Sequence, residues 1–266
     1  MLKKILFTLC VCSLIALTFI YKRSVHDPKK SFSDLQEKSA SLQHLGIIMD
    51  GNRRWARKQG LQPWLGHKHG IEALKIALKF CIKKRIPYLT LYTFSQENFK
   101  RPAEELDYLF NTIAQEIKQT CYELLMKNNI QIRFLGRREL FPEHLKESIA
   151  TIEEQTSRNT GLRVNIMFCY SGRQELVHAV KQIISKHLAP EDITEDIIAD
   201  HLWTAHIPDP DLIIRTGYVH RLSNFLPYQS VYSELYFIDC YWPEITEEHL
   251  EDALQYYESI HRTFGA

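Results

Sequence analysis

The side chains best suited to chemistry begin with one acid surrounded by cations. Asp50 is followed by a glycine, an asparagine and two arginines, and residues 50–70 hold five lysines or arginines but no second acid. A glycine here permits a sharp turn, and the free N–H groups at the start of a helix bind phosphate. An aspartate among such cations can hold Mg²⁺, which bridges to the same phosphate oxygens. The pattern therefore indicates a metal-assisted anion site; the alternative is a solvated basic surface on which Asp50 only caps a helix.

Two further polar stretches have the composition of binding loops. The first, residues 95–101, combines hydroxyl, amide, carboxylate, aromatic and guanidinium groups just before Pro102. In the second, Arg215 and Arg221 lie six residues apart and are followed by Ser223. Two guanidinium groups suit a diphosphate because each can make bidentate contacts. For the first stretch a simpler explanation is equally good, namely a loop that caps the helix beginning at Pro102.

Short apolar runs alternate with longer helical patterns along the chain. Strands are predicted where the runs are β-branched or aromatic, at residues 45–49, 88–94, 130–135, 164–170, 212–215 and 235–237. Several runs are apolar almost throughout, as expected when both faces of a strand are covered. Apolar residues at helical spacing predict helices over 71–85, 102–128, 142–158, 174–187, 194–203 and 246–262. This alternation predicts an α/β fold with a central, mostly parallel, six-stranded sheet flanked by helices.

The polar stretches follow the first, second and fifth predicted strands. Ligands of parallel α/β sheets bind beyond the carboxyl ends of the strands, so we expect the three stretches to meet there. Glu234 stands beside the last apolar run. It is either a second metal carboxylate or a paired surface acid, and the residues alone favour the surface acid.

The first 43 residues form a hydrophobic segment and a polar tether ahead of a globular domain at residues 44–266. Residues 5–21 carry no charge, a length at the lower limit for crossing a bilayer, and six lysines or arginines flank them. This positive charge places the bulk of the chain in the cytoplasm. Two interpretations are equally good: an anchor at the inner face of the cytoplasmic membrane, or an interfacial or dispensable extension. A cleaved signal peptide is disfavoured because no A-x-A-like site follows.

Composition and missing signatures count against several classes of function. The formal net charge is only +1, so nothing indicates a nucleic-acid partner. The sequence contains no GxGxxG, GxxxxGK[ST], HExxH or GxSxG motif, which leaves dinucleotide binding, a phosphate loop, zinc proteolysis and a hydrolase elbow unsupported. The six cysteines include no CxxC pair, so neither a zinc site nor a disulfide scaffold is indicated.

Taken together and in order, these stretches resemble the successive motifs of the cis-prenyltransferase family, whose most similar bacterial members are the undecaprenyl diphosphate synthases. The resemblance extends from about His44 to the carboxyl terminus and leaves out the first 43 residues. Its motifs are IIMDGNRRWA, GH, FSQENFKRP, IRTG, RLSNF and ELYF, at residues 47–56, 66–67, 94–102, 214–217, 221–225 and 234–237.

The resemblance implies a homodimeric α/β enzyme with a long apolar tunnel for its product. It implies Mg²⁺-dependent, sequential cis-condensation of isopentenyl diphosphate onto an allylic diphosphate such as farnesyl diphosphate. The expected product is a polyprenyl diphosphate such as C55 undecaprenyl diphosphate, the precursor of a lipid carrier for cell-wall synthesis. Membrane contact is expected through residues 5–21 and through release of this product.

The resemblance also assigns roles to individual positions. Asp50 is the essential acid and Mg²⁺ ligand, and Asn98 occupies the place of a proton acceptor. An amide is barely basic, so we expect Asn98 to position a proton path. Glu234 matches a second metal ligand that the partner subunit of a dimer can supply. The expected substrate-binding residues are Gly51, Asn52, Arg53, Arg54, Trp55, His67, Ser95, Gln96, Glu97, Phe99, Arg101, Arg215, Arg221, Leu222 and Ser223.

Some positions depart from the family pattern. Pro63 stands where many relatives have an arginine, and Arg53, a glycine in some members, can supply the missing charge. Tyr218 and Val219 replace a common Gly-Glu pair.

Two other functions remain open. One alternative function is a non-catalytic, membrane-anchored partner subunit of the same fold, which the presence of Asp50 and Asn98 disfavours. The other is a plain phosphate-binding or nucleotide-binding α/β module.

Overall fold

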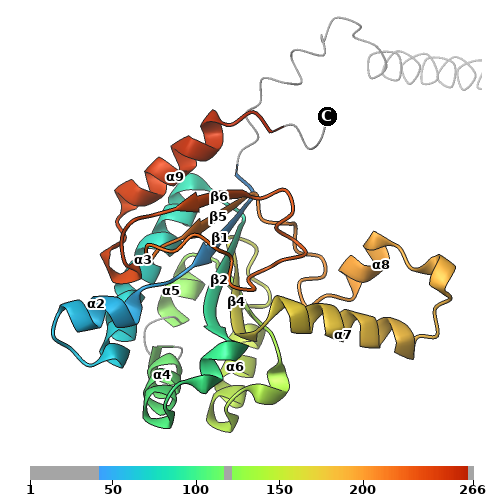
Figure 1. The fold of residues 1–266 in the computed structure, drawn as a ribbon, viewed down its shortest axis with the longest axis horizontal. Helices are drawn as coiled ribbons and strands as arrows, with labels where there is room; N and C mark the ends of the chain where they lie inside the picture. Colours follow the sequence, from blue (N-terminus) through green and yellow to red (C-terminus); the bar gives the residue numbers. More distant parts are fainter. Residues whose placement is uncertain (1–41, 117–121, 263–266) are drawn as a thin grey trace, which may run out of the picture. The chain divides into compact units, whose positions relative to one another are not determined.

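The computed structural model describes residues 42–116 and 122–262 (Figure 1). The predicted N-terminal segment, including residues 5–21, lies outside these residues except for Leu42 and Gln43. Among the helices of the described ranges, none is both long and apolar enough to cross a membrane.

A six-stranded, entirely parallel sheet forms the centre of the domain. The strands are β1 (His44–Ile48), β2 (Tyr88–Ser95), β3 (Gln131–Leu135), β4 (Arg163–Tyr170), β5 (Leu212–Arg215) and β6 (Glu234–Phe237). Their order across the sheet is β3-β4-β2-β1-β5-β6, and every neighbouring pair is parallel. The predicted sheet and its six strands are confirmed, with ends that shift by one residue or not at all.

Both faces of the sheet are buried, which explains why β1 carries no polar side chain after His44. On one face, Leu45 and Ile47 belong to the larger core cluster, to which α3 (Gly66–Lys84), α6 (Glu143–Thr156) and α9 (Glu247–Ser259) contribute. On the other face, Ile48 belongs to a smaller cluster that includes Phe225 and packs against Trp203. The second face is therefore covered largely by the chain around β5, and only the first by several helices.

The other helices agree in place with the sequence pattern. α2 (Asn52–Lys58) begins directly after β1, and α4 (Ala103–Glu116) begins after Pro102. The predicted helix over residues 102–128 is described as α4 and α5 (Tyr122–Lys127), with residues 117–121 outside the described ranges. α7 (Gly172–Ser185) and α8 (Glu195–Asp200) complete the set, and Figure 1 shows α7 leading away from the sheet toward α8.

The order of the strands brings the three polar stretches together. β1 pairs with β2 on one side and with β5 on the other. The residues that follow these three strands therefore leave the sheet side by side at its carboxyl edge. This is the arrangement that the sequence predicts for the site.

A buried carboxylate, that of Glu175, ties the start of α7 to the segment after α8. Glu175 accepts hydrogen bonds from the Thr204 N–H and hydroxyl groups, from the Gln229 amide and from the Tyr170 phenol. Burial, together with the Glu175 charge, raises the pKa of Tyr170, so the phenol stays protonated as a donor. All four donors thus depend on one side chain that is 1% exposed.

Replacing this carboxylate should destabilise the domain. A Glu175→Gln variant keeps the volume but loses half of the accepting oxygens, leaving buried donors unpaired at about 1–3 kcal/mol each. We expect the free energy of unfolding to fall by about 2 kcal/mol or more, measured by urea denaturation. Glu154→Gln, a change at an exposed position of α6, is the matched control, and equal effects of the two changes would contradict this account.

His44 links β1 to β2 and to the chain before β5 as a neutral ring. Its Nδ1 lies 2.6 Å from the Pro208 carbonyl oxygen, and its Nε2 lies 2.7 Å from Thr90 Oγ1. The Nδ1–H group donates to the carbonyl, which leaves Nε2 to accept from the hydroxyl. Burial lowers the pKa of His44 from 6.5 to about 4.

This lowered pKa predicts a pH dependence of stability. The unfolded chain takes up the proton more readily than the folded one, so stability is complete above pH 6.5 and falls as the pH drops toward 4. Between pH 7 and pH 5, His44 alone should cost about 2 kcal/mol of unfolding free energy. Urea denaturation at the two pH values should show a smaller loss in a His44→Gln variant, and an unchanged loss would contradict the prediction.

Candidate active site

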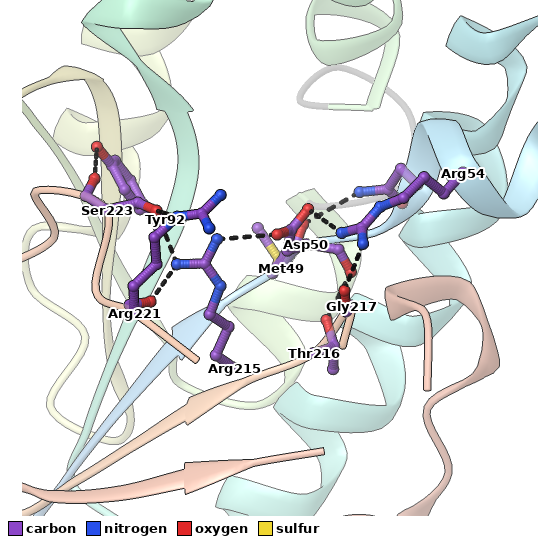
Figure 2. Close-up of polar contacts among 10 residues, drawn as sticks. Met49, Asp50, Arg54, Tyr92, Arg215, Thr216, Gly217, Arg221 and Ser223 are labelled. Carbon is purple, nitrogen blue, oxygen red and sulfur yellow. Dashed lines mark hydrogen bonds and ion pairs between the residues drawn. The ribbon is translucent and has the colours of Figure 1, made fainter. Parts of the chain in front are cut away.

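Asp50 lies between two arginines at the carboxyl edge of the sheet (Figure 2). Its Oδ2 is 2.9 Å from Nη2 of Arg215, at the end of β5, and its Oδ1 is 3.0 Å from Nη2 of Arg54, on α2. The backbone carbonyl of Asp50 accepts from the Thr216 hydroxyl (2.7 Å) and from the Trp242 N–H group (3.0 Å). The carboxylate is therefore held on a fixed backbone between two guanidinium groups that come from opposite sides.

Arg215 is the most enclosed cation of the site, with its side chain only 4% exposed. Its Nη1 donates to Ser223 Oγ (2.8 Å) and to the backbone carbonyl of Arg221. Arg221 Nε also donates to Ser223 Oγ (3.2 Å). The loop after β5 thus folds back over its own strand, and it gathers Arg215, Arg221 and Ser223 as the sequence predicted.

Two glycines allow the chain to pass close to these ion pairs. Gly51 has φ +109°, and a Cβ atom there would lie 2.7 Å from the Tyr241 ring. Gly217 has φ +94°, and a Cβ there would lie 2.7 Å from Arg54 Nη2. The Gly217 carbonyl accepts from Arg54 Nη1 at 2.5 Å. Any other residue at these positions would combine backbone strain with a steric clash.

A cavity of about 350 Å³ opens beside Asp50. We refer to it as the catalytic cavity, after the predicted catalytic residues Asp50 and Asn98 that line it. It is lined by residues from β1, β2 and β5 and from the segments that follow them. Of the predicted residues, the cavity brings together Asp50, Gly51, Asn52, Arg53, Arg54, His67, Ser95, Asn98, Arg101, Arg215 and Ser223. It is also lined by Ile48, Met49, Arg57, Tyr92 and Thr93. Five arginines and one carboxylate therefore line the same cavity.

Other predicted residues lie beside the cavity or away from it. Trp55 packs against His69, with ring centroids 4.6 Å apart, and Glu97 accepts from the Asn224 amide at 3.1 Å. Leu222 packs against the smaller core cluster. Gln96, Phe99 and Arg221 also lie outside the lining.

Glu234 is not brought to Asp50 within the chain. It begins β6 and is paired in register with Leu212, whereas Arg215 is paired with Phe237 at the other end of the strand. A strand rises about 3.3 Å per residue, so Glu234 lies roughly 10 Å along the sheet from the level of Arg215.

Glu105, on the first turn of α4, is a site residue that the sequence analysis did not single out. Its carboxylate is 1% exposed and lies 3.3 Å from Arg53 Nη2 and 3.4 Å from Arg101 Nη1. One buried charge thus holds two arginines that line the cavity, one from α2 and one from the loop before α4. The available signal was the spacing of four residues between Arg101 and Glu105, which places an arginine just before the helix and an acid in its first turn.

His67 lines the catalytic cavity as a neutral imidazole. Burial, followed by the charges of Arg101 and Arg53, lowers the pKa of His67 to about 3. Its Nε2 is buried and has no hydrogen-bond partner among the described residues, and the same is true of Arg53 Nε. Buried polar atoms normally find a partner, so these two atoms are suited to receive a ligand group.

Asn98 is held by a reciprocal pair of hydrogen bonds with Ser95. The Ser95 N–H group donates to Asn98 Oδ1 (3.1 Å), and the Asn98 N–H group donates to the Ser95 side chain. The amide oxygen is already engaged, which leaves the Nδ2 donor as the free end of the side chain. This geometry favours a positioning role over proton abstraction by the amide.

The residues present fit a divalent cation that is shared with a substrate. Among the described residues, no group of three or more His, Cys, Asp or Glu side chains could hold a metal alone. Mg²⁺ commonly uses one or two carboxylates, with waters and substrate phosphates as the other ligands. Asp50 lines the cavity and each of its oxygens keeps a free lone pair beside the guanidinium contact, so it can serve as such a ligand.

Comparison with known sequences gives a consistent result. A family model described as putative undecaprenyl diphosphate synthase matches residues 48–265. An isoprenyl transferase of Halalkalibacterium halodurans is 41% identical over 233 residues, covering 86% of this chain and 91% of the relative. An isoprenyl transferase of Streptococcus pneumoniae is 42% identical over 230 residues, covering 84% and 91%.

Solved structures give the same picture. A lavandulyl diphosphate synthase from Lavandula x intermedia, in complex with dimethylallyl diphosphate, superposes with a TM-score of 0.82 at 32% identity, covering 85% of this chain and 99% of that one. A probable undecaprenyl diphosphate synthase from Campylobacter jejuni superposes with a TM-score of 0.72 at 31% identity, with the same coverage. The likeness thus extends over nearly all of the described residues.

Proposed function

The chain belongs to the cis-prenyltransferase family of enzymes, and we propose that it extends an allylic diphosphate by repeated cis-condensation with isopentenyl diphosphate. The observation that best supports this function is the pair of contacts Arg54–Asp50–Arg215, at 3.0 and 2.9 Å. One carboxylate joins two groups of cations, so two diphosphates bound there would lie next to each other. Head-to-tail joining of two diphosphate substrates needs this proximity.

The first group of cations suits the allylic diphosphate. Arg53, Arg54 and Arg101 line the catalytic cavity with His67 and the backbone at Gly51. The unpartnered Nε atom of Arg53 and Nε2 atom of His67 would donate to diphosphate oxygens. Arg53 lines the cavity while Pro63, in a short 3-10 turn, does not, which supports the idea that Arg53 supplies the charge that Pro63 lacks.

The second group suits isopentenyl diphosphate. Arg215, Arg221 and Ser223 are joined by hydrogen bonds and lie on the opposite side of Asp50 from Arg54. Both Nη atoms of Arg215 already have acceptors, so its guanidinium group is fixed before a substrate arrives. A fixed donor costs no reorganisation when charge develops on the ligand.

The chemical step separates charge, and the cavity is built to accept it. Breaking the allylic C–O bond places negative charge on the departing diphosphate, which Arg53, Arg54 and Arg101 would stabilise. A Mg²⁺ ion bound at Asp50 would add Lewis-acid stabilisation of the same oxygens. The new carbon–carbon bond forms as the isopentenyl double bond attacks, and a proton then leaves that unit. Asn98 would orient this proton path, with a diphosphate oxygen as the acceptor.

The prenyl chain would extend along the aromatic cluster around Phe94, the residue between Thr93 and Ser95, which line the cavity. Phe94 packs against Phe99 and Phe110 with ring centroids 5.0 and 5.2 Å apart, and Phe110 lies 6.0 Å from Phe168. Burying each CH₂ group gains about 0.8 kcal/mol, so a tunnel along this cluster would retain the chain between cycles. We propose a product of the C55 undecaprenyl diphosphate class, used for a cell-wall lipid carrier.

A homodimer accounts for apolar side chains near the edge strand β6. Val231 is 69% exposed and Tyr232 61% exposed, just before the strand, and Leu235 within it is 37% exposed. Pairing of two chains there would cover this surface and could carry Glu234 toward the site of the other chain as a second metal ligand. Residues 5–21 remain the proposed membrane contact, outside the described ranges.

The proposed activity is tested with the purified full chain, Mg²⁺, farnesyl diphosphate and radiolabelled isopentenyl diphosphate. We expect incorporation into butanol-extractable product with chain lengths near C55. Chelation of divalent ions should abolish incorporation, and readdition of Mg²⁺ should restore it. Absence of incorporation until a second, different chain is added would instead support the non-catalytic partner subunit.

A further inference from the structure

A second cavity lies at the carboxyl edge of the sheet, beyond the edge strand β3. Its volume is about 450 Å³, larger than that of the catalytic cavity. Its lining shares no residue with the catalytic cavity. One wall comes from the end of β3 and the turn after it, and the other comes from one face of α7. We refer to it as the β3–α7 cavity.

The charges of the β3–α7 cavity are strongly unbalanced. Arg133, Arg137, Arg138 and Lys181 line it, and Glu139 is the one acid in the lining. Glu139 is occupied by Arg137, whose Nε lies 2.8 Å from Oε1. Arg138 pairs with a glutamate outside the lining, at 2.7 Å.

Two of these cations have no partner of opposite charge among the described residues. Within the described ranges, neither Arg133 nor Lys181 makes an ion pair. Arg133 alternates along β3 with Ile132 and Phe134, which face the core, so its side chain faces the opposite way. Lys181 comes from α7. Two cations without an ion-pair partner among the described residues thus line one cavity, one from β3 and one from α7. This arrangement favours the binding of a multivalent anion.

An aromatic wall completes the β3–α7 cavity. Trp203 and His178 both line it, with ring centroids 5.4 Å apart and planes inclined by 36°. Val177, one residue earlier on α7, is 44% exposed and adds an apolar surface. A ring or short apolar group could pack on this wall while a phosphate group meets the arginines.

We propose that the β3–α7 cavity is a second binding site, for an organic phosphate whose phosphate group binds Arg133 and Lys181 and whose flat or apolar portion packs on Trp203. Guanidinium and ammonium groups are the usual partners of phosphate in proteins. A cavity of this size is within the range of small-molecule sites. The phosphate can belong to a soluble metabolite or to the headgroup of an anionic lipid, since both present the same chemistry to the two cations.

The test compares the wild-type chain with the double variant Arg133→Gln/Lys181→Gln. Binding of ADP, which carries a diphosphate and a flat ring, is measured by titration calorimetry. We expect the double variant to bind ADP at the β3–α7 cavity at least tenfold more weakly. Any binding of ADP to the catalytic cavity should be the same in both proteins. Quenching of tryptophan fluorescence by ADP should decrease in a Trp203→Phe variant. Because neither cation lines the catalytic cavity, prenyl transfer at saturating substrate should be retained, which also reports correct folding.

A matched control removes the same charge elsewhere. Arg158→Gln/Lys186→Gln alters two exposed cations outside the β3–α7 cavity and should bind ADP as the wild type does. Sedimentation with phosphatidylglycerol vesicles, compared with phosphatidylcholine vesicles, distinguishes an anionic lipid headgroup from a soluble metabolite as the source of the phosphate. If the wild type binds phosphatidylglycerol vesicles but not ADP, and the double variant no longer binds these vesicles, the ligand is a lipid headgroup. Equal binding of ADP and of both kinds of vesicle by wild type and double variant would overturn the proposal.

Discussion

An Asp50→Asn variant is expected to lose about 10²–10³-fold in kcat/KM. Asparagine keeps the size of the side chain but removes the charge that Arg54 and Arg215 share, at 3.0 and 2.9 Å. Arg215 is 4% exposed and would keep only neutral acceptors. Removing one preorganised electrostatic contact from a catalytic site costs factors of this size, and here the proposed metal ligand is lost as well.

The measurement is steady-state incorporation of isopentenyl diphosphate at saturating Mg²⁺, with kcat and KM determined for each substrate. Asp107→Asn, on an exposed position of α4, is the matched control and should retain wild-type activity. Circular dichroism and urea denaturation establish whether the Asp50 variant is folded. A folded Asp50→Asn protein with activity within a few-fold of the wild type would contradict the proposed role.

Replacement of Glu105 should have the second largest effect on catalysis. Glu105→Gln removes the buried charge that holds Arg53 and Arg101, at 3.3 and 3.4 Å. The two guanidinium groups would then repel each other without a shared counter-charge. Displacing a contact residue by about 1 Å can cost up to about 100-fold. We expect a loss of about 10–100-fold in kcat/KM for the allylic substrate.

This prediction has a close control and a distinctive readout. Glu104→Gln alters the exposed neighbouring residue of the same helical turn and should change little. Glu105→Asp keeps the charge and should recover part of the activity. Because Arg215 lies on the other side of Asp50, the KM for isopentenyl diphosphate should change less than that for the allylic diphosphate. Equal losses in Glu104→Gln and Glu105→Gln would show that the shared carboxylate does not position the arginines.

The strands could be predicted from the sequence because their burial leaves a strong local signal. A run such as Leu45–Ile48 is apolar at every position, and both faces are covered in the structure. Helix ends were less accurate: α8 is Glu195–Asp200, against the predicted 194–203. The residues around Trp203 instead pack against the second face of the sheet, a tertiary contact that local periodicity does not encode.

The candidate site could be predicted as a set of stretches, and its geometry only in part. The contact of Asp50 with Arg215 follows from the pairing of β1 with β5, which is consistent with the rule for parallel sheets. The role of Glu105 depends on α4 packing near α2, and nothing in the local sequence specifies this. Glu234 is a different case, because register places it at the far end of β6, so its predicted metal role depends on a second chain. The sequence does not indicate the β3–α7 cavity, because the cations that line it are spread over residues 133–181.

The five arginines that line the catalytic cavity with Asp50 should influence the rate of the reaction as well as its chemistry. A concentration of positive charge draws anionic substrates from several ångströms away, and dissolved ions weaken this pull within a Debye length of about 8–10 Å at physiological salt. The same attraction would retain the diphosphate that each proposed condensation liberates. At low ionic strength, release of diphosphate would therefore limit turnover. At high ionic strength, binding of the next isopentenyl diphosphate would become the slow step.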